Sequence, residues 1–193
     1  YASRGLGDVY KRQVSNGATH LLTGENQTAL TQGYYSDYTK FSDSEAEAIR
    51  RYYDYMIRYE NLFFAPELQD VTMTHTGWDN YEYQCTSHKV SSYGEAGKIW
   101  MILREKDYRK CIYLLNLCGQ SEDYWNEGKE EPNIQKDIKF TVQVDTPVEK
   151  ICFSTPDGEN MDAIELSFTE RATKTGKFID FTVPSLNLSL IHI

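Results

Sequence analysis

The chain has 193 residues, with 20 Lys and Arg against 29 Asp and Glu, so its formal net charge is −9. An acidic surface repels phosphate backbones and anionic lipid heads, which argues against nucleic acid and membranes as partners and suits a neutral ligand. Fifteen Tyr, eight Phe and three Trp supply aromatic side chains, which either pack in β-sheets or stack on sugar rings.

Both ends of the chain match one DNA element read in opposite directions. Residues 8–13 can be encoded by GATGTGTATAAGAGACAG, and residues 188–193 by its reverse complement. This DNA resembles the end sequence of a transposase sequencing adaptor. We therefore expect residues 1–13 and 188–193 to be adaptor-derived and the natural segment to run over residues 14–187.

A helix is predicted to follow a loop-rich stretch that ends near residue 43. Asn16-Gly17 and Gly24 mark turns before it, and Ser42 and Glu45 have the spacing of a capping box. Apolar residues then recur every three or four positions, as expected of a helix, at Ile49, Tyr52, Tyr53, Met56, Tyr59 and Phe63. Pro66 is expected to end this helix.

Beyond Pro66 the hydrophobic period becomes alternating, which predicts short strands. These are expected at residues 71–76, 84–88, 99–106, 110–117, 137–144, 150–154, 163–169 and 177–183. Three sets of residues should each share a face: Phe140, Val142 and Val144; Ile164, Leu166 and Phe168; and Ile179, Phe181 and Val183. The pattern favours an antiparallel β-sandwich. Residues 99–106 and 110–117 are apolar on both faces and should be central, with the helix a candidate cover for the outer face.

The cysteines and the missing motifs exclude several classes of site. Cys85, Cys111, Cys118 and Cys152 have no zinc spacing, so no metal or other cofactor is predicted. Cys111 and Cys152 lie in apolar runs and are interpreted as buried free thiols, which favours a reducing compartment. The sequence contains neither a Gly-x-Ser-x-Gly elbow nor a phosphate-binding glycine loop.

Three groups of residues carry a resemblance to a known family. They are Asn16–His20 with Gly24-Glu25 and Tyr34-Tyr35, the tyrosine-rich segments Arg51–Tyr55 and Arg58–Leu62, and the strand Ile112–Leu117. In this order they resemble glycoside hydrolase family 66, the bacterial dextranases and cycloisomaltooligosaccharide glucanotransferases. One departure is Leu22, where the resemblance leads us to expect an acidic residue.

The resemblance implies an enzyme with a (β/α)8 barrel and a C-terminal β-sandwich. Residues 14–66 would be the last strand, loop and helix of a truncated barrel, and residues 67–187 the sandwich, giving a mainly β chain with one long helix. Family members cleave α-1,6-linked glucan with retention through an Asp nucleophile and a Glu acid/base. Those carboxylates would lie outside this chain, so no catalytic residue is assigned and the fragment itself is expected to be inactive.

Candidate sugar-binding residues lie near the expected last barrel strand. Barrel enzymes build their sites on loops at the C-terminal ends of strands, so His20, Glu25 and Asn16 are predicted to bind glucose hydroxyls. The alternative is a packing role for His20 and ordinary loop roles for the other two. The sequence leaves the roles of six other residues open. The aromatic residues Tyr34, Tyr35, Trp78 and Trp125 either contact sugar or pack, and His75 and His88 either bind a metal or sugar or pack.

The expected partners are an α-glucan oligo- or polysaccharide and the missing N-terminal part of the barrel. A non-catalytic carbohydrate-binding or structural β-sandwich of another enzyme is the first alternative. A cyclising glucanotransferase is the second. The family suggests secretion or a cell-surface location, whereas the unpaired cysteines suit the cytoplasm.

Overall fold

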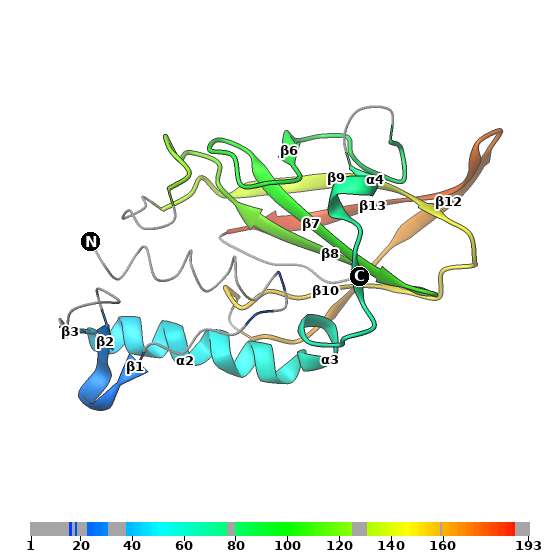
Figure 1. The fold of residues 1–193 in the computed structure, drawn as a ribbon. Coiled ribbons are helices and arrows are strands. Elements are labelled where there is room, and N and C mark those ends of the chain that lie inside the picture. The colour runs from blue at the N-terminus through cyan, green and yellow to red at the C-terminus, as the bar shows by residue number, and fades with distance from the viewer. Residues whose placement is uncertain are drawn as a thin grey trace. The chain divides into compact units, whose positions relative to one another are not determined.

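The chain is mainly β with one long helix, as predicted (Figure 1). The computed structural model describes residues 16, 18, 23–30, 38–76, 80–124, 131–158 and 160–187. They form two compact units. The N-terminal unit contains the described residues up to Phe64 together with Tyr124, and the β unit contains Ala65–Asp123 and the described residues from Glu131 onward.

The N-terminal unit combines a small sheet with the long helix. Strands β1 (Thr23–Gly24), β2 (Thr28–Leu30) and β3 (Tyr38–Lys40) form an antiparallel sheet in that order, with the 3-10 turn η1 (Glu25–Gln27) between the first two. Helices α2 (Asp43–Arg58) and α3 (Glu60–Phe63) follow.

The capping box predicted at the start of α2 is present. The Ser42 hydroxyl accepts a hydrogen bond from Glu45 N, and Ser42 N donates to Glu45 Oε2 at 2.8 Å. The predicted helix is interrupted at Tyr59, whose φ of −113° and ψ of 29° are not helical. Aromatic packing continues across this break, since the Tyr55 ring lies 4.8 Å from the Tyr59 ring and 5.8 Å from the Phe63 ring.

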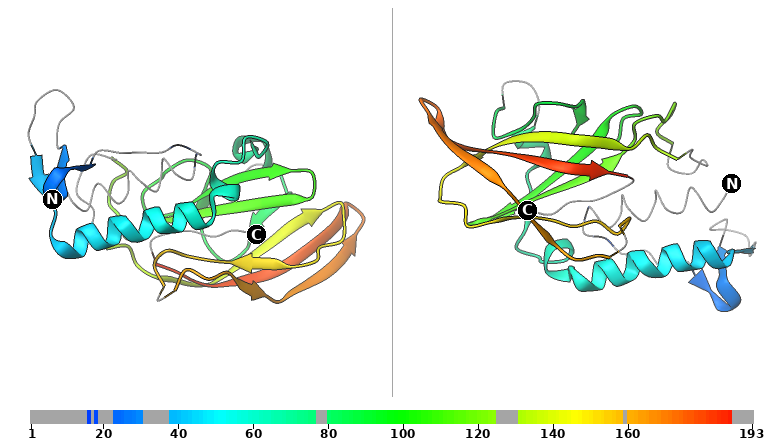
Figure 2. Two further views of the ribbon diagram at one scale, coloured as in Figure 1. Left: turned by 90° about the horizontal axis from the view of Figure 1, so that it is seen from below. Right: turned by 180° about the vertical axis from the view of Figure 1, so that it is seen from behind.

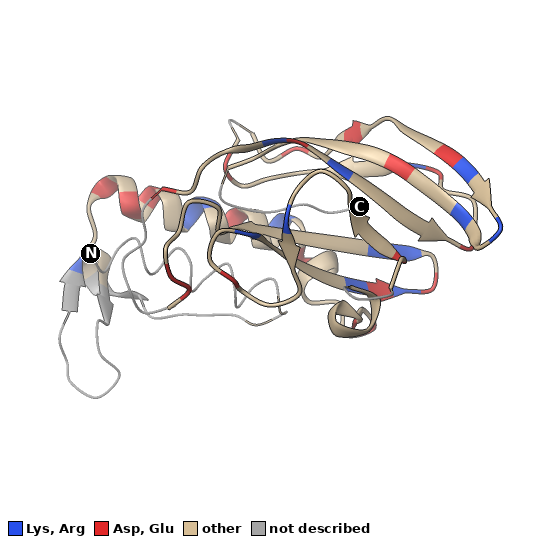
Figure 3. Ribbon diagram, turned by 90° about the horizontal axis from the view of Figure 1, so that it is seen from above, with Lys and Arg blue, Asp and Glu red and all other residues tan. Residues whose placement is uncertain are grey.

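One sheet of the β unit is long and antiparallel. Its order is β12 (Phe168–Thr173), β13 (Gly176–Leu186), β9 (Gln135–Val144) and β5 (Tyr83–Cys85). Acidic and basic residues are interspersed along β12 and β13 (Figure 3). The pairing of β13 with β9 skips Pro184 and Asp137, because proline has no N–H to donate, and Asp137 there has a φ of 54°.

The second sheet is built on a hairpin. Strands β7 (Ile99–Lys106) and β8 (Arg109–Asn116) pair in antiparallel register around the turn residues Asp107 and Tyr108. On the other edge of β7 lie β4 (Gln69–Asp70) and β6 (Val90–Ser91). Strand β6 was not predicted and runs parallel to β7, so the expectation of a wholly antiparallel arrangement was wrong. Strands β10 (Ile151–Phe153) and β11 (Ile164–Leu166) form a separate pair.

The two large sheets lie in two layers around one core (Figure 2). The predicted inward faces of β9 and β13 are confirmed, and Phe140 stacks on Phe181 with ring centroids 5.5 Å apart. The core contains Tyr83, Ile99, Met101, Leu103, Ile112, Leu114, Ile138, Phe140, Val142, Val144, Ile151, Phe153, Leu166, Ile179, Phe181, Val183 and Leu186. The opposite face of β7 and β8 is buried as well, with Ile102, Tyr113 and Leu115 at most 2% exposed. Both faces of the hairpin are therefore buried, as its sequence predicts, although among the described strands β8 pairs only with β7.

Two predicted strands were wrong. Residues 71–76 contain the short helix α4 (Thr72–His75), because Asp70 Oδ1 accepts from Thr72 N at 2.8 Å and the Thr72 hydroxyl accepts from Leu103 N at 2.9 Å. Residues 163–169 belong to two strands, since the chain passes from β11 to the sheet of β12 at Ser167. The face predicted there is therefore broken, and Ile164 is exposed.

Candidate functional site

The described part of the structure does not test the three predicted sugar-binding residues as a group. Asn16 lies in an exposed turn. Glu25 begins η1, beside Asn26 and Gln27, whose φ angles of 59° are left-handed. His20 lies outside the described residues, and so do the aromatic candidates Tyr34, Tyr35, Trp78 and Trp125. The sugar-binding assignment therefore stays a prediction.

The two histidines of the β unit have local partners. His75 Nδ1 lies 2.8 Å from the Thr74 hydroxyl, and its Nε2 lies 3.3 Å from Glu105 Oε1. His88 Nδ1 lies 2.7 Å from the Ser87 hydroxyl. Within the described ranges, no group of three or more His, Cys, Asp or Glu side chains is arranged to hold a metal ion.

A polar cluster around Glu105 joins four elements of the β unit. Glu105 lies near the end of β7, and its Oε2 accepts hydrogen bonds from Lys110 Nζ on β8 at 2.6 Å and from the Tyr83 hydroxyl on β5 at 2.8 Å. His75 on α4 faces its other oxygen. Lys110 Nζ also lies 5.2 Å from the centre of the Tyr83 ring. We call Glu105, Lys110, Tyr83 and His75 the Glu105 cluster.

The Glu105 cluster keeps its carboxylate ionised. Burial alone would raise the pKa of Glu105, but hydrogen bonds from Lys110 and Tyr83 and the nearby charges of Lys110 and His75 outweigh it, so the pKa lies below its ordinary value. The pKa of the Tyr83 hydroxyl is raised by burial and by the adjacent carboxylate, so this hydroxyl stays protonated and donates to Glu105.

This chemistry suits a structural tie better than a catalytic acid. A general acid needs a raised pKa so that it carries a proton at neutral pH, whereas the pKa of Glu105 is lowered. A retaining glycosidase also needs a second carboxylate about 5–5.5 Å away. The side chains that shift the pKa of Glu105 are Lys110, Tyr83 and His75, and none of them is a carboxylic acid. The cluster therefore holds the hairpin to β5 and α4.

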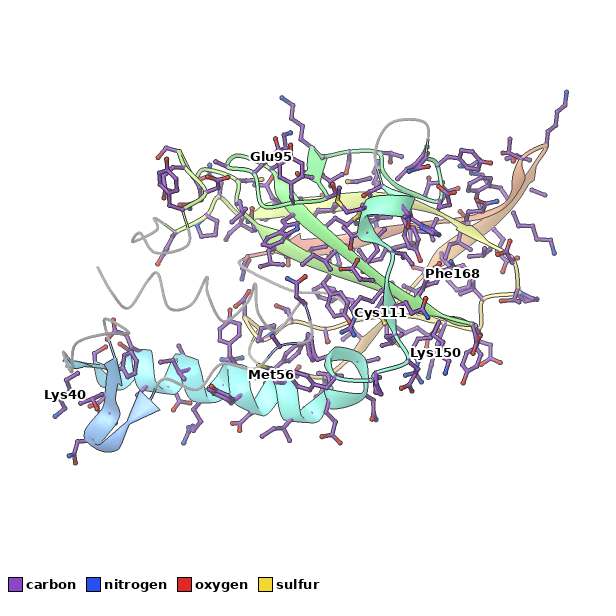
Figure 4. The ribbon with its side chains drawn as sticks, in the orientation of Figure 1. Lys40, Met56, Glu95, Cys111, Lys150 and Phe168 are labelled. Carbon is purple, nitrogen blue, oxygen red and sulfur yellow. The ribbon has the colours of Figure 1, made fainter. Side chains whose placement is uncertain are left out.

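The four cysteines are free thiols, and Cys111 is buried as predicted (Figure 4). Burial raises the pKa of Cys111 to about 11, against a smaller opposing hydrogen bond from Tyr113. Cys152, also predicted to be buried, is only half-buried on β10. A thiol with so high a pKa is almost entirely protonated at neutral pH, so Cys111 is a packing residue and not a nucleophile.

Membrane insertion through a helix has no support in the described residues. Among the helices found there, none combines the length and the apolar character that crossing a bilayer requires.

The comparisons with known proteins agree with one another. Two cycloisomaltooligosaccharide glucanotransferases of Niallia circulans are similar to this chain, one 28% identical over 89% of the chain and the other 25% identical over 93%. The chain spans only 17% and 18% of the lengths of these relatives. A crystal structure of a Paenibacillus cycloisomaltooligosaccharide glucanotransferase complexed with cycloisomaltoheptaose matches the fold with a TM-score of 0.85 at 21% identity, over 100% of this chain and 27% of that one. The sequence pattern of glycosyl hydrolase family 66 matches residues 12–189, and the chain therefore belongs to that family.

Proposed function

We propose that this chain is the C-terminal part of an enzyme that acts on α-1,6-linked glucan, either dextran or isomaltooligosaccharides. The observation that carries the proposal is the family match over residues 12–189. The names of the two relatives and the cyclic glucan in the Paenibacillus complex support the substrate class. The net charge of −9 is compatible with such a ligand, because a neutral glucan has no charge to be repelled.

In this proposal the N-terminal unit is the end of a (β/α)8 barrel and the β unit is the sandwich that follows it. The missing part of the barrel supplies an Asp nucleophile and a Glu acid/base, which retain the anomeric configuration through a covalent glycosyl intermediate. Two observations support a chain without its own catalytic pair. It spans less than a fifth of its relatives, and Glu105, the half-buried carboxylate of its polar cluster, is held ionised.

The test of this assignment is a dextran assay on the purified chain. We expect no release of reducing sugar, while a longer protein that contains this chain and the rest of its barrel releases it. The Glu105→Gln variant of the chain is the matched control. Sugar release that the native chain shows and this variant loses would place catalysis at Glu105 and overturn the proposal.

A cyclising glucanotransferase is the second candidate, and the names of both relatives favour it. The two reactions share the glycosyl intermediate and differ in the acceptor, which is water in hydrolysis and the far end of the same glucan in cyclisation. Mass spectrometry of the products of the longer protein separates them, because a cyclic oligosaccharide is lighter than its linear counterpart by one water molecule.

The predicted sugar contacts can be tested in the same longer protein. Replacing Glu25 by Gln or Asn16 by Ala should raise KM for dextran, because each change removes a hydrogen-bonding group at the predicted wall of the cleft. His20→Ala should do the same. Unchanged kinetics in all three variants would show that these residues have loop or packing roles.

A further inference from the structure

The Leu-Asn-Leu sequence at the end of β8 contains a buried amide with several backbone partners. Asn116 is 1% exposed. Its Oδ1 accepts a hydrogen bond from Cys118 N at 3.0 Å. Its Nδ2 faces three carbonyl oxygens, those of Asn133 at 2.9 Å, Leu186 at 3.3 Å and Asn187 at 2.7 Å.

The chemistry of an amide fixes how this site is arranged. An Asn side chain has two N–H donors, so each of the two closer carbonyls accepts one N–H, and the carbonyl of Leu186 shares one of these two donors. The amide cannot be turned over, because a carbonyl oxygen accepts hydrogen bonds and never donates them. One side chain therefore binds the backbone of three segments: residues 116–118, the stretch just before β9, and the end of β13.

Two of these segments are the feet of one loop. The chain passes from Gly119 through Tyr124, which belongs to the N-terminal unit, and returns to the β unit at Glu131. At the feet Asn133 N donates to Cys118 O at 2.9 Å. Gly119 has a φ of 89°, which favours glycine, and a Cβ there would lie 2.8 Å from Asn133 Nδ2, so the Asn133 side chain would have to move.

We infer that Asn116 is a positioning residue that couples the end of β13 to both feet of this loop. Loosening either foot should loosen the end of β13, which lies about seventy residues beyond Asn116 in the sequence, because the feet and the strand end are bound to the same amide. This inference does not depend on the proposed enzyme activity.

Amide hydrogen exchange of the full chain tests the coupling. Asn116→Asp keeps an acceptor for Cys118 N but has no N–H to offer the three carbonyls when it is ionised. Burial beside carbonyl oxygens raises the pKa of such a carboxyl group, so exchange is compared at a pH where the group is ionised. There we expect the protection factors of Asn133 and Leu186 to fall about tenfold or more, since each lost bond is worth about one factor of ten. On acidification the variant should recover part of this protection, because a protonated carboxyl group can donate one hydrogen bond.

Thr72→Val is the matched control. Thr72 is also a buried side chain bonded to backbone, through Leu103 N at 2.9 Å, but it lies near the opposite end of β7. The Thr72→Val variant should lower the protection near Leu103. The protection of Asn133 and Leu186 should stay unchanged relative to the rest of the sheets. A uniform fall in protection in Asn116→Asp, with no acid recovery, would overturn the inference.

Gly119→Ala perturbs a foot of the loop instead of Asn116 and is the alternative test if Asn116→Asp does not fold. Its methyl group would push against Asn133 and strain the backbone at a φ of 89°. The hydrogen bonds of Asn116 are the proposed link between Gly119 and β13. The inference therefore requires lower protection at Leu186 as well as at Asn133. A loss confined to residues 117–133 would show that the loop and the strand end are independent.

Discussion

Replacing Glu105 by Gln removes the charge at the centre of the Glu105 cluster and keeps the size of the side chain. Gln can still accept one hydrogen bond, but it no longer attracts Lys110, whose Nζ lies 2.6 Å from the carboxylate, or a protonated His75 at 3.3 Å. A charge-assisted hydrogen bond contributes about 1.5–3 kcal/mol when it is buried. These side chains are 22–28% exposed, so solvent weakens the attraction.

The expected loss at neutral pH is about 2 kcal/mol in the free energy of unfolding. For a chain of this size that corresponds to a fall in Tm of about 4–8 °C. Urea unfolding followed by near-ultraviolet circular dichroism measures the change. Glu95→Gln is the control. Among the described residues, Glu95 bonds to the nearby Ser91 at the end of β6 and to Lys98, at 2.5 and 2.8 Å. These are local contacts, so its loss should lower Tm by much less.

The pH dependence gives a sharper test. The folded-state pKa of Glu105 lies below the ordinary value of 4.5, so the folded protein binds this proton less readily than the unfolded chain does. The stabilisation is therefore complete above pH 4.5 and is lost as the pH falls through the lowered pKa. The difference between the native chain and Glu105→Gln should shrink over that acid range. A difference that stays constant or grows would refute the assignment of Glu105 as an ionised tie.

Two further predictions concern the cap of α2 and the thiol of Cys111. Ser42→Ala should destabilise the N-terminal unit by about 1 kcal/mol because it removes the hydroxyl that caps α2, whereas Ser42→Asp should retain most of the stability; helicity during urea unfolding measures both, and equal losses would contradict the capping role. Cys111, with a pKa of about 11, should not react with a thiol reagent at pH 8 in the native chain. Cys111→Ser should then leave the number of labelled thiols unchanged, and a decrease by one would show that Cys111 is accessible.

The fold was predictable wherever local patterns decide structure. The capping box at Ser42 determines where α2 begins, and the apolar runs around Asp107-Tyr108 determine the β7 and β8 hairpin. In each case the signal lies within one turn of helix or one strand pair. The prediction failed at α4, where the alternation of residues 71–76 imitates a strand while contacts with Leu103, far along the chain, select a helical turn.

The family could be inferred from the order of its motifs, and the long helix and the core strands from periodic burial and capping, which depend on neighbouring residues. The polar chemistry depends on contacts that form only in the folded chain. His75, Tyr83, Glu105 and Lys110 come from four elements, and Asn116 reaches the carbonyl of Asn187, 71 residues away. Hydrogen bonds between such distant residues depend on strand register and turn geometry, which no local pattern encodes.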